Sequence, residues 1–534
     1  MIKPERAVWI LAIFYFLLNL GLLSAKYNFD GTVFSLHLEM VKAGGSFGLL
    51  LHPRHLLYEP LGYLFWNLLW LFGLKIRSFL ALEIFDLAIS SLCLAVFALN
   101  LVLLQPKRKF SALFFALGLG FCWGWWFLSV EPEVYILAVL VLNLSFYFML
   151  RSFSSTRISQ CAVWLSLLAS LCLFSHLAYS LFWIPLIYFL ARVSPGKWLK
   201  KFYPALMTLT LAFVLSASVY LLAFHLNPLA QAQSGARPEK FMKWFFGLAL
   251  SETPYGYEQS YWNLSLSAFP QWLDGIWSCF WGKDSLAESA LWLNSLRIYS
   301  LGVLVSCILA YIYFYLREWG KRDLRCNLIW LWLIPGALFT ILWEPANYEH
   351  KLYFLPALWM MAFLGFDKLG SLLNQKFAIF IFALAFLILF IINLQTRIIP
   401  GANPENNREL KLALMLRDLT LNNGVIVISG ARSGNNIQKI YIPYFAQRNT
   451  IVLDWVLSRR IDGKGFPENL RKIIKDKLME GKPVYVLSEA LQGPALDELS
   501  SHHKIQSKAL QEFWDQFQLK PIFQTEGVMV YQVI

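Results

Sequence analysis

Long apolar runs dominate the first 395 residues of the chain, and short clusters of charged residues separate them. An α-helix needs about 20 apolar residues to cross the hydrocarbon core of a bilayer. By this rule the sequence predicts about eleven transmembrane helices, at 7–24, 78–104, 111–129, 134–150, 160–175, 178–193, 204–224, 291–316, 326–343, 352–369 and 376–395. The shorter stretch 58–74 is rich in aromatic residues and is expected to form an amphipathic helix that lies flat at the membrane interface.

Beyond residue 395 the pattern changes to short apolar segments that alternate with amphipathic ones. Strands are expected at 422–430, 449–455, 483–489 and 527–534, and helices at 436–447, 467–480 and 505–517. Such alternation predicts a small soluble α/β domain with a largely parallel sheet. The loop 429–436 contains glycines but no phosphate-binding motif, so we interpret it as a plain turn. The sequence thus predicts a membrane domain at 1–395 and an α/β domain at 396–534.

Composition supports a membrane protein. Of the 534 residues, 58% are hydrophobic and 15% are charged, a balance that would make a soluble protein aggregate. The net charge of +13 does not indicate nucleic-acid binding, because the Lys and Arg residues cluster in short loops between apolar runs. The seven cysteines form no CxxC pair and indicate neither a disulfide framework nor a zinc site.

The charges of the short loops indicate how the chain is oriented. Two or more Lys or Arg residues occur in IKPER near the N-terminus and in the loops at 105–109, 151–157, 192–201, 317–325 and 367–376. The alternate loops, at 129–135, 174–176 and 343–351, share one Lys. Because basic loops stay in the cytoplasm, we expect a cytoplasmic N-terminus and an extracytoplasmic C-terminal domain. In a prokaryote the protein would lie in the plasma or inner membrane.

This orientation gathers ionisable residues at the outer membrane face. Residues of this kind at the ends of spans are candidates for function. They are Asp30, Glu131, Glu133, His176, Glu349, His350 and Lys351, together with His52 and Arg54 in the long first loop.

Each candidate has a catalytic and a structural interpretation. Asp30 is suited to act as a general base or to cap the following helix. Arg54 has a planar set of donors that fits a phosphate, either of a substrate or of a lipid headgroup. Glu131 and Glu133 are candidate catalytic acids or helix caps. His176 is a packing or a reacting residue, and Lys351 either neutralises a phosphate or extends to the interface.

Four stretches together resemble a known family. "FDGTVF", "LLHPRHLLYEPLGYLFWNLL", "EPEVYILAVLVLN" and "FSHLAYSLFWIPL" are similar to segments of the GT-C superfamily of integral-membrane glycosyltransferases, in its protein O-mannosyltransferase-like branch. The resemblance implies a polyprenyl-phosphate-sugar donor, a protein, lipid or glycan acceptor, and inversion at the anomeric carbon. It implies Asp30 as general base and Glu133 as second acid. Arg54 and Lys351 would hold the phosphate, with Glu131, His52, His176, Glu349 and His350 binding substrate.

The sequence departs from the family pattern at two places. Gly31 follows Asp30 where the family often has a second acid, which leaves dependence on a divalent cation, Mg²⁺ or Mn²⁺, open and makes no cofactor certain. His52-Pro53-Arg54 replaces a His-Pro-Pro-like element and adds a cation.

Two other classes of protein stay as alternatives. A glycan polymerase or ligase of another membrane superfamily would use a late outer loop, and the Trp-rich loop 225–290 offers His225, Arg237 and Glu258. That loop is also suited to form an interfacial aromatic belt or a sugar-binding surface. A lipid or solute transporter would place acids in mid-span and show two repeated halves, which the sequence does not.

Overall fold

The structure is a computed structural model that describes residues 4–153, 158–194, 198–228, 241, 244, 267–283, 291–318, 323–431, 437–458, 465–525 and 527–534. The chain divides into two compact units. The helical unit comprises Met1–Ser24 and His37–Ala402, and the C-terminal unit comprises Ala25–Leu36 and Asn403–Ile534. The C-terminal unit is therefore built from two separate pieces of the chain.

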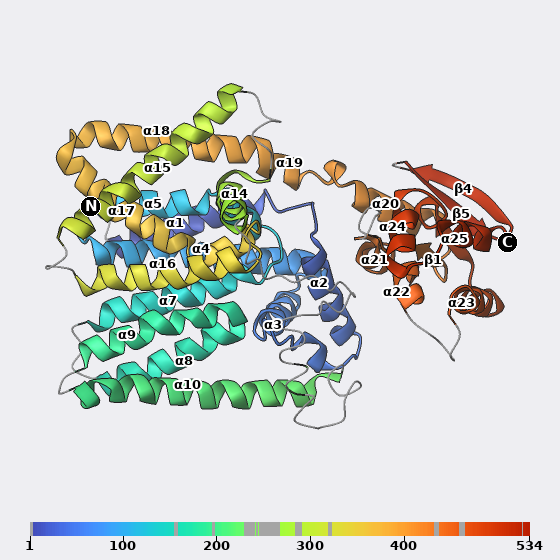
Figure 1. The fold of residues 1–534 in the computed structure, drawn as a ribbon, viewed down its shortest axis with the longest axis horizontal. Helices are drawn as coiled ribbons and strands as arrows, with labels where there is room; N and C mark the ends of the chain where they lie inside the picture. Colours follow the sequence, from blue (N-terminus) through green and yellow to red (C-terminus); the bar gives the residue numbers. More distant parts are fainter. Residues whose placement is uncertain are drawn as a thin grey trace. The chain divides into compact units, whose positions relative to one another are not determined.

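Each expected span of the helical unit coincides with helix (Figure 1). The helices are α1 (Pro4–Leu20), α4 (Ser78–Leu104), α5 (Lys109–Gly120), α6 (Trp123–Ser129), α7 (Tyr135–Ser152), α8 (Ile158–Ser175), α9 (Trp183–Val193), α10 (Trp198–Leu226), α15 (Leu291–Arg317), α16 (Leu324–Leu342), α17 (Leu355–Leu372) and α18 (Gln375–Asn393). Within the described residues, six of these helices are long and apolar enough to cross a membrane, or seven if a bent pair counts as one span. The membrane-crossing criterion thus supports six or seven spans among the described helices, and the expectation of about eleven stays a prediction.

The third expected span, at 111–129, is broken. Helices α5 and α6 meet at an angle of 75° around Phe121 and Cys122. Asn393 of α18 donates hydrogen bonds from Nδ2 to the carbonyl oxygens of Phe121 (2.9 Å) and Phe280 (2.8 Å). A break at membrane depth needs such a donor, because lipid offers no partner for a freed carbonyl. The sequence pattern, which is apolar throughout, gave no sign of the bend.

The first loop of the helical unit contains helices, as expected. α2 (Phe29–Lys42) is followed by a 3-10 turn (Phe47–Leu50) and by α3 (Tyr58–Leu71), which falls in the stretch 58–74. α3 buries Tyr58 and Trp66 and exposes Leu64 and Leu71. Its exposed side is apolar, which is the surface that an interfacial helix presents to lipid. A second short helix, α14 (Ala268–Trp281), lies in the described part of the loop 225–290.

The C-terminal unit contains a five-stranded sheet in the order β2-β1-β3-β5-β4. The strands are β1 (Val425–Ile428), β2 (Asn449–Val452), β3 (Val484–Leu487), β4 (Leu519–Thr525) and β5 (Val528–Val533). β1 pairs in parallel with β2 and β3, whereas β5 is antiparallel to β3 and β4. The sheet is therefore mixed, and the prediction of a largely parallel sheet holds for one half. β4 was missed because most of its side chains are exposed and give no apolar pattern.

Helices cover both faces of this sheet. Alternate residues of β1 and β3 face opposite sides, so that Val427 and Val486 belong to one core and Ile428 and Leu487 to the other. The helices are α20 (Arg408–Leu419), α21 (Gln438–Tyr441), α22 (Leu453–Ser458), α23 (Glu468–Met479), α24 (Pro494–His503) and α25 (Ser507–Trp514). Three of them, α21, α23 and α25, fall in the segments expected to be helical.

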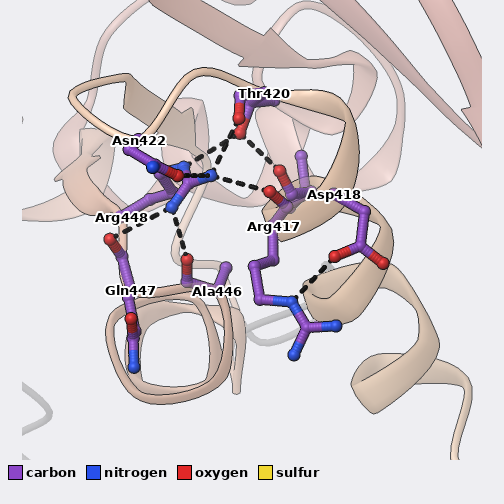
Figure 2. Close-up of polar contacts among 8 residues, drawn as sticks. Arg417, Asp418, Thr420, Asn422, Ala446, Gln447 and Arg448 are labelled. Atoms are coloured by element: carbon purple, nitrogen blue, oxygen red, sulfur yellow. Dashed lines mark hydrogen bonds and ion pairs between the residues drawn. The ribbon is translucent and has the colours of Figure 1, made fainter.

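The buried residue Arg448 bonds the C-terminal end of α20 (Figure 2). Arg448, which precedes β2, is 4% exposed. Its guanidinium donates to the carbonyl oxygens of Arg417 (2.7 Å), Thr420 (2.8 Å) and Ala446 (2.8 Å), and to Asn422 Oδ1 (3.0 Å). The last carbonyls of a helix have no partner within the helix, so Arg448 acts as the C-terminal cap of α20.

Replacing Arg448 with methionine is expected to destabilise the C-terminal unit by about 3 kcal/mol, because several buried carbonyls lose their donors. For a unit of this size the melting temperature should fall by roughly 10 °C, which differential scanning fluorimetry of the full chain can measure. Arg417→Met is the matched control, since the Arg417 side chain is exposed and pairs with Asp418 at the surface. Equal shifts for the two variants would contradict the capping role of Arg448.

Candidate active site

The loop that contains His52, Pro53 and Arg54 is held in place by its backbone. Tyr220 of α10 donates its hydroxyl to the carbonyl oxygen of Pro53 at 2.9 Å. The backbone N–H of Leu177, just after α8, donates to the carbonyl oxygen of Arg54 at 3.0 Å. Contacts from helices far apart in sequence thus fix a loop that has no regular structure of its own.

Two donors of the Arg54 guanidinium have no partner within the described ranges of the chain. Its Nε and Nη2 atoms are buried and make no hydrogen bond to the residues that the structure describes. A buried donor without an acceptor costs about 1–3 kcal/mol, and more when it is charged. The arrangement is suited to an anion, because an oxyanion would supply the missing acceptors through charge-assisted bonds.

Imidazole rings surround this cation. The rings of His52 and His55 are stacked with centroids 4.3 Å apart. The centroid of the His176 ring lies 6.4 Å from that of His350, and the Tyr135 ring is within 6 Å of both. Three of the predicted residues thus contact other rings: His52 contacts His55, and His176 and His350 contact Tyr135.

The imidazoles of His52 and His176 are neutral at physiological pH. Burial, and then the charges of His350 and Arg54, lower the pKa of His176 to about 3. Burial and the charge of Arg54 also lower the pKa of His52 to about 3. The Nδ1 of His176 accepts a hydrogen bond from the backbone N–H of Ala178 (3.3 Å), so its proton is on Nε2. Neutral imidazoles can donate to a phosphate without adding charge.

The turn before α17 contains His350 and two more predicted residues, Glu349 and Lys351. His350 Nε2 lies 3.1 Å from Glu344 Oε2, and Asn347 Nδ2 donates to both Glu344 (2.9 Å) and Glu349 (3.4 Å). Burial would raise the pKa of Glu344, but the hydrogen bond and charge of His350, with Asn347 and Arg54, outweigh it and lower this pKa. Glu344 therefore stays ionised and fixes the His350 ring.

Lys351 is buried rather than extended to an interface. Lys351 is 1% exposed, and its Nζ donates to the carbonyl oxygen of Pro345 at 2.8 Å. Gly275 of α14 permits this packing, because a Cβ there would lie 2.9 Å from Lys351 Cε. Burial lowers the pKa of Lys351 to about 7, although Cys279 and Glu344 oppose the shift. Of the two interpretations of Lys351, the structure excludes the snorkelling one.

Glu131 and Glu133 lie among other carboxylates. Both are buried, at 0% and 3% exposure. The backbone N–H of Glu133 donates to Asp86 Oδ2 (2.9 Å), which also accepts from the Tyr58 hydroxyl (2.6 Å). Glu83 Oε1 and Asp86 Oδ1 are buried without a hydrogen-bond partner among the described residues. Sequence reasoning missed both acids of α4, although a carboxylate inside a predicted span is itself a signal of function.

Asp30 belongs to the C-terminal unit. It lies exposed in the first turn of α2. At this helix end the N–H of Gly31 donates to Asn28 Oδ1 (2.7 Å), and both interpretations of Asp30, as base and as cap, stay predictions.

The backbone just before Asp30 is tied to the rest of the C-terminal unit. Asn407 Nδ2 donates to the carbonyl oxygens of Ala25 (2.8 Å) and Lys26 (3.0 Å). The hydroxyl of Tyr441 donates to the carbonyl oxygens of Lys26 (2.6 Å) and Tyr27. Tyr27 has a φ of 47°, a backbone conformation that residues other than glycine rarely adopt without such support.

Replacing Tyr441 with phenylalanine is expected to loosen this backbone, because two carbonyls lose a donor. Amide hydrogen exchange of residues 25–30 should become roughly tenfold faster, as the loss of about 1.4 kcal/mol implies. The matched control is Tyr531→Phe in β5, a residue paired with Val486 of β3. Unchanged exchange at 25–30 would show that Asn407 alone holds the segment.

Comparison with solved structures identifies the fold. The chain aligns over 99% of its length with 97% of ArnT from Cupriavidus metallidurans, in the apo state (TM-score 0.60, 10% identity) and bound to undecaprenyl phosphate (TM-score 0.59, 11% identity). The chain has the GT-C fold. No family model matches the sequence, and no curated protein matches it.

Two further GT-C structures align over 99% of the chain. Oligosaccharyltransferase AglB from Archaeoglobus fulgidus, in complex with an inhibitory peptide and a dolichol-phosphate, is covered over 74% of its length (TM-score 0.52, 12% identity). Arabinofuranosyltransferase AftD from Mycobacteria is covered over 40% (TM-score 0.51, 13% identity). At these identities the likeness concerns the fold.

The outcome for the predicted site within the GT-C fold is uneven. The structure brings together His52, Arg54, His176 and His350, with Glu349 and Lys351 in the adjoining turn, and it buries Glu131 and Glu133 beside two acids of α4. Arg237 and Glu258, most of the loop 225–290 and most of the loop 429–436 lie outside the described residues. His225 is exposed at the end of α10.

Proposed function

We propose that the protein is a membrane glycosyltransferase that moves a sugar from a polyprenyl-phosphate donor to an acceptor hydroxyl at the extracytoplasmic face. The observation that carries the proposal is the guanidinium of Arg54 in a GT-C fold, because two of its buried donors have no acceptor in the described part of the chain. The neutral imidazoles of His52 and His176 lie near it. This is a site for a phosphate that carries one or two charges. Undecaprenyl phosphate and dolichol-phosphate are bound in two of the structures that share the fold.

The chemistry requires one base and a stabilised leaving group. Asp30 accepts the proton of the acceptor hydroxyl while its oxygen attacks the anomeric carbon in line. The bond from that carbon to the phosphate oxygen breaks, and its electron pair stays on the phosphate, so the configuration inverts. Arg54 and Lys351 stabilise the departing phosphate, and Glu133 positions the acceptor.

The proposal includes a topology. The chain would cross the membrane about eleven times within 1–395, with α3 on the interface, a cytoplasmic N-terminus and an extracytoplasmic domain at 396–534. Its support is the distribution of Lys and Arg, because the basic loops lie on one side of the helical pattern.

The test is transfer of sugar by the purified full chain in lipid. Polyprenyl-phosphate donors that differ in their sugar are supplied with a peptide, lipid or glycan acceptor, and release of polyprenyl phosphate is measured. We expect release from at least one donor that depends on the acceptor. Absence of release from every donor, with a folded protein, would refute the proposal.

Donor binding should depend on pH through Lys351. Because the pKa in the folded protein is about 7, the ammonium is present below pH 7 and is lost as the pH rises. We expect the dissociation constant of the donor to increase about tenfold between pH 6 and pH 8, which corresponds to about 1.4 kcal/mol. In Lys351→Arg the charge persists, and the slope should flatten. Calorimetric titrations at each pH measure both proteins; parallel curves would remove Lys351 from phosphate binding.

A further inference from the structure

A group of metal-binding side chains lies at the carboxyl edge of the sheet in the C-terminal unit. Asp454 is in the first turn of α22, directly after β2, and its backbone N–H donates to the carbonyl oxygen of Ser429 at 3.1 Å. Ser429 follows β1. Asp454 is therefore held beyond the ends of two parallel strands, which is the edge where α/β sheets bind ligands.

Two histidines reach the same place from α24. His502 and His503 occupy its last turn, and the helix ends there because Lys504 adopts a left-handed conformation (φ 54°). His503 Nε2 lies 2.9 Å from Asp454 Oδ1. One ligand atom from each of Asp454, His502 and His503 lies within 4.8 Å of the other two.

We infer that Asp454, His502 and His503 form a zinc-binding site. Imidazole nitrogen and carboxylate oxygen bind Zn²⁺ at about 2.0–2.2 Å, which places tetrahedral ligand atoms about 3.3–3.6 Å apart. The observed spacing needs only a small change of rotamer, which His502 can make because its side chain is exposed. Three protein ligands leave the fourth position of the ion to water or to a ligand.

The burial of the group favours a metal over a surface ion pair. The side chains of Asp454 and His503 are 8% and 11% exposed, so a carboxylate and an imidazole have been withdrawn from water together. An ion pair between Asp454 and His503 accounts for two of the three side chains whose ligand atoms converge here. Zinc engages all three.

The test uses metal content and affinity, which do not depend on sugar transfer. The purified full chain is stripped with EDTA, loaded with ZnCl₂, freed of unbound metal and analysed by mass spectrometry, and zinc is titrated by calorimetry. We expect the wild type to retain one zinc ion more per chain than Asp454→Asn or His502→Gln, and affinity to fall at least tenfold in each. The same titration with Co²⁺ should give the intense absorption of a tetrahedral site in the wild type only.

Asp497→Asn is the matched control, because Asp497 is an exposed acid of α24 that bonds Ser507. It should bind zinc as the wild type does. His502→Gln guards against misfolding, since the residue is exposed, and melting temperatures in EDTA should match. Equal zinc content and affinity in the wild type and in both site variants would overturn the inference, whatever zinc is bound elsewhere. Loss of sugar transfer would not bear on it.

Discussion

Replacement of Arg54 by lysine is expected to lower kcat/KM for sugar transfer by roughly hundredfold, the usual effect of removing a preorganised donor from developing negative charge. Lysine keeps the charge but lacks the planar fork of donors. In Arg54 two of these donors are buried without a partner among the residues that the structure describes. Release of polyprenyl phosphate under single-turnover conditions measures the effect on the chemical step.

The control for Arg54 is Arg77→Lys. Arg77 is an exposed residue of the same unit whose guanidinium bonds Glu39 at 3.1 and 3.2 Å. Its replacement should change activity less than twofold, since surface ion pairs contribute about 0–1 kcal/mol. If both variants keep wild-type activity, the phosphate is bound elsewhere.

Asp30→Asn should reduce the rate of transfer by about 10²–10⁴-fold, because asparagine cannot accept the proton of the acceptor hydroxyl. The protein should remain folded, as Asp30 is exposed and the end of α2 is capped by Asn28. Donor affinity should be unchanged, so the loss should appear in kcat and not in the dissociation constant of the donor.

A charge-matched control lies on the same helix. Glu39→Gln removes one negative charge from α2 and should preserve most of the activity. Full activity of Asp30→Asn would assign the base to another residue, and the buried acids Glu131 and Glu133 would be the next to test.

The sequence predicted helix positions well and their interruptions poorly. Spans follow from the thickness of the bilayer, which a run of apolar residues reveals directly. The bend between α5 and α6 depends on Asn393, which is 272 residues away from Phe121 in sequence, and local pattern has no access to such a bond. The sequence analysis missed β4 for a related reason, because its pairing with β5 leaves most of its side chains exposed.

The residues of the candidate site were also predicted only in part. The loop charges predicted which residues share one face, and the structure joins His52, Arg54, His176 and His350. Glu83 and Asp86 were overlooked because they lie in an apolar run that looked like an ordinary span.

The two-piece construction of the C-terminal unit affects how deletions should be interpreted. A fragment that starts at Asn403 would lack Ala25–Leu36, so Asn407 and Tyr441 would lose their acceptors and the isolated domain should be difficult to produce in folded form. A protein cut after Ala402 would release the backbone that leads to Asp30. Inactivity of that truncated enzyme would be no proof that the missing domain recognises a substrate.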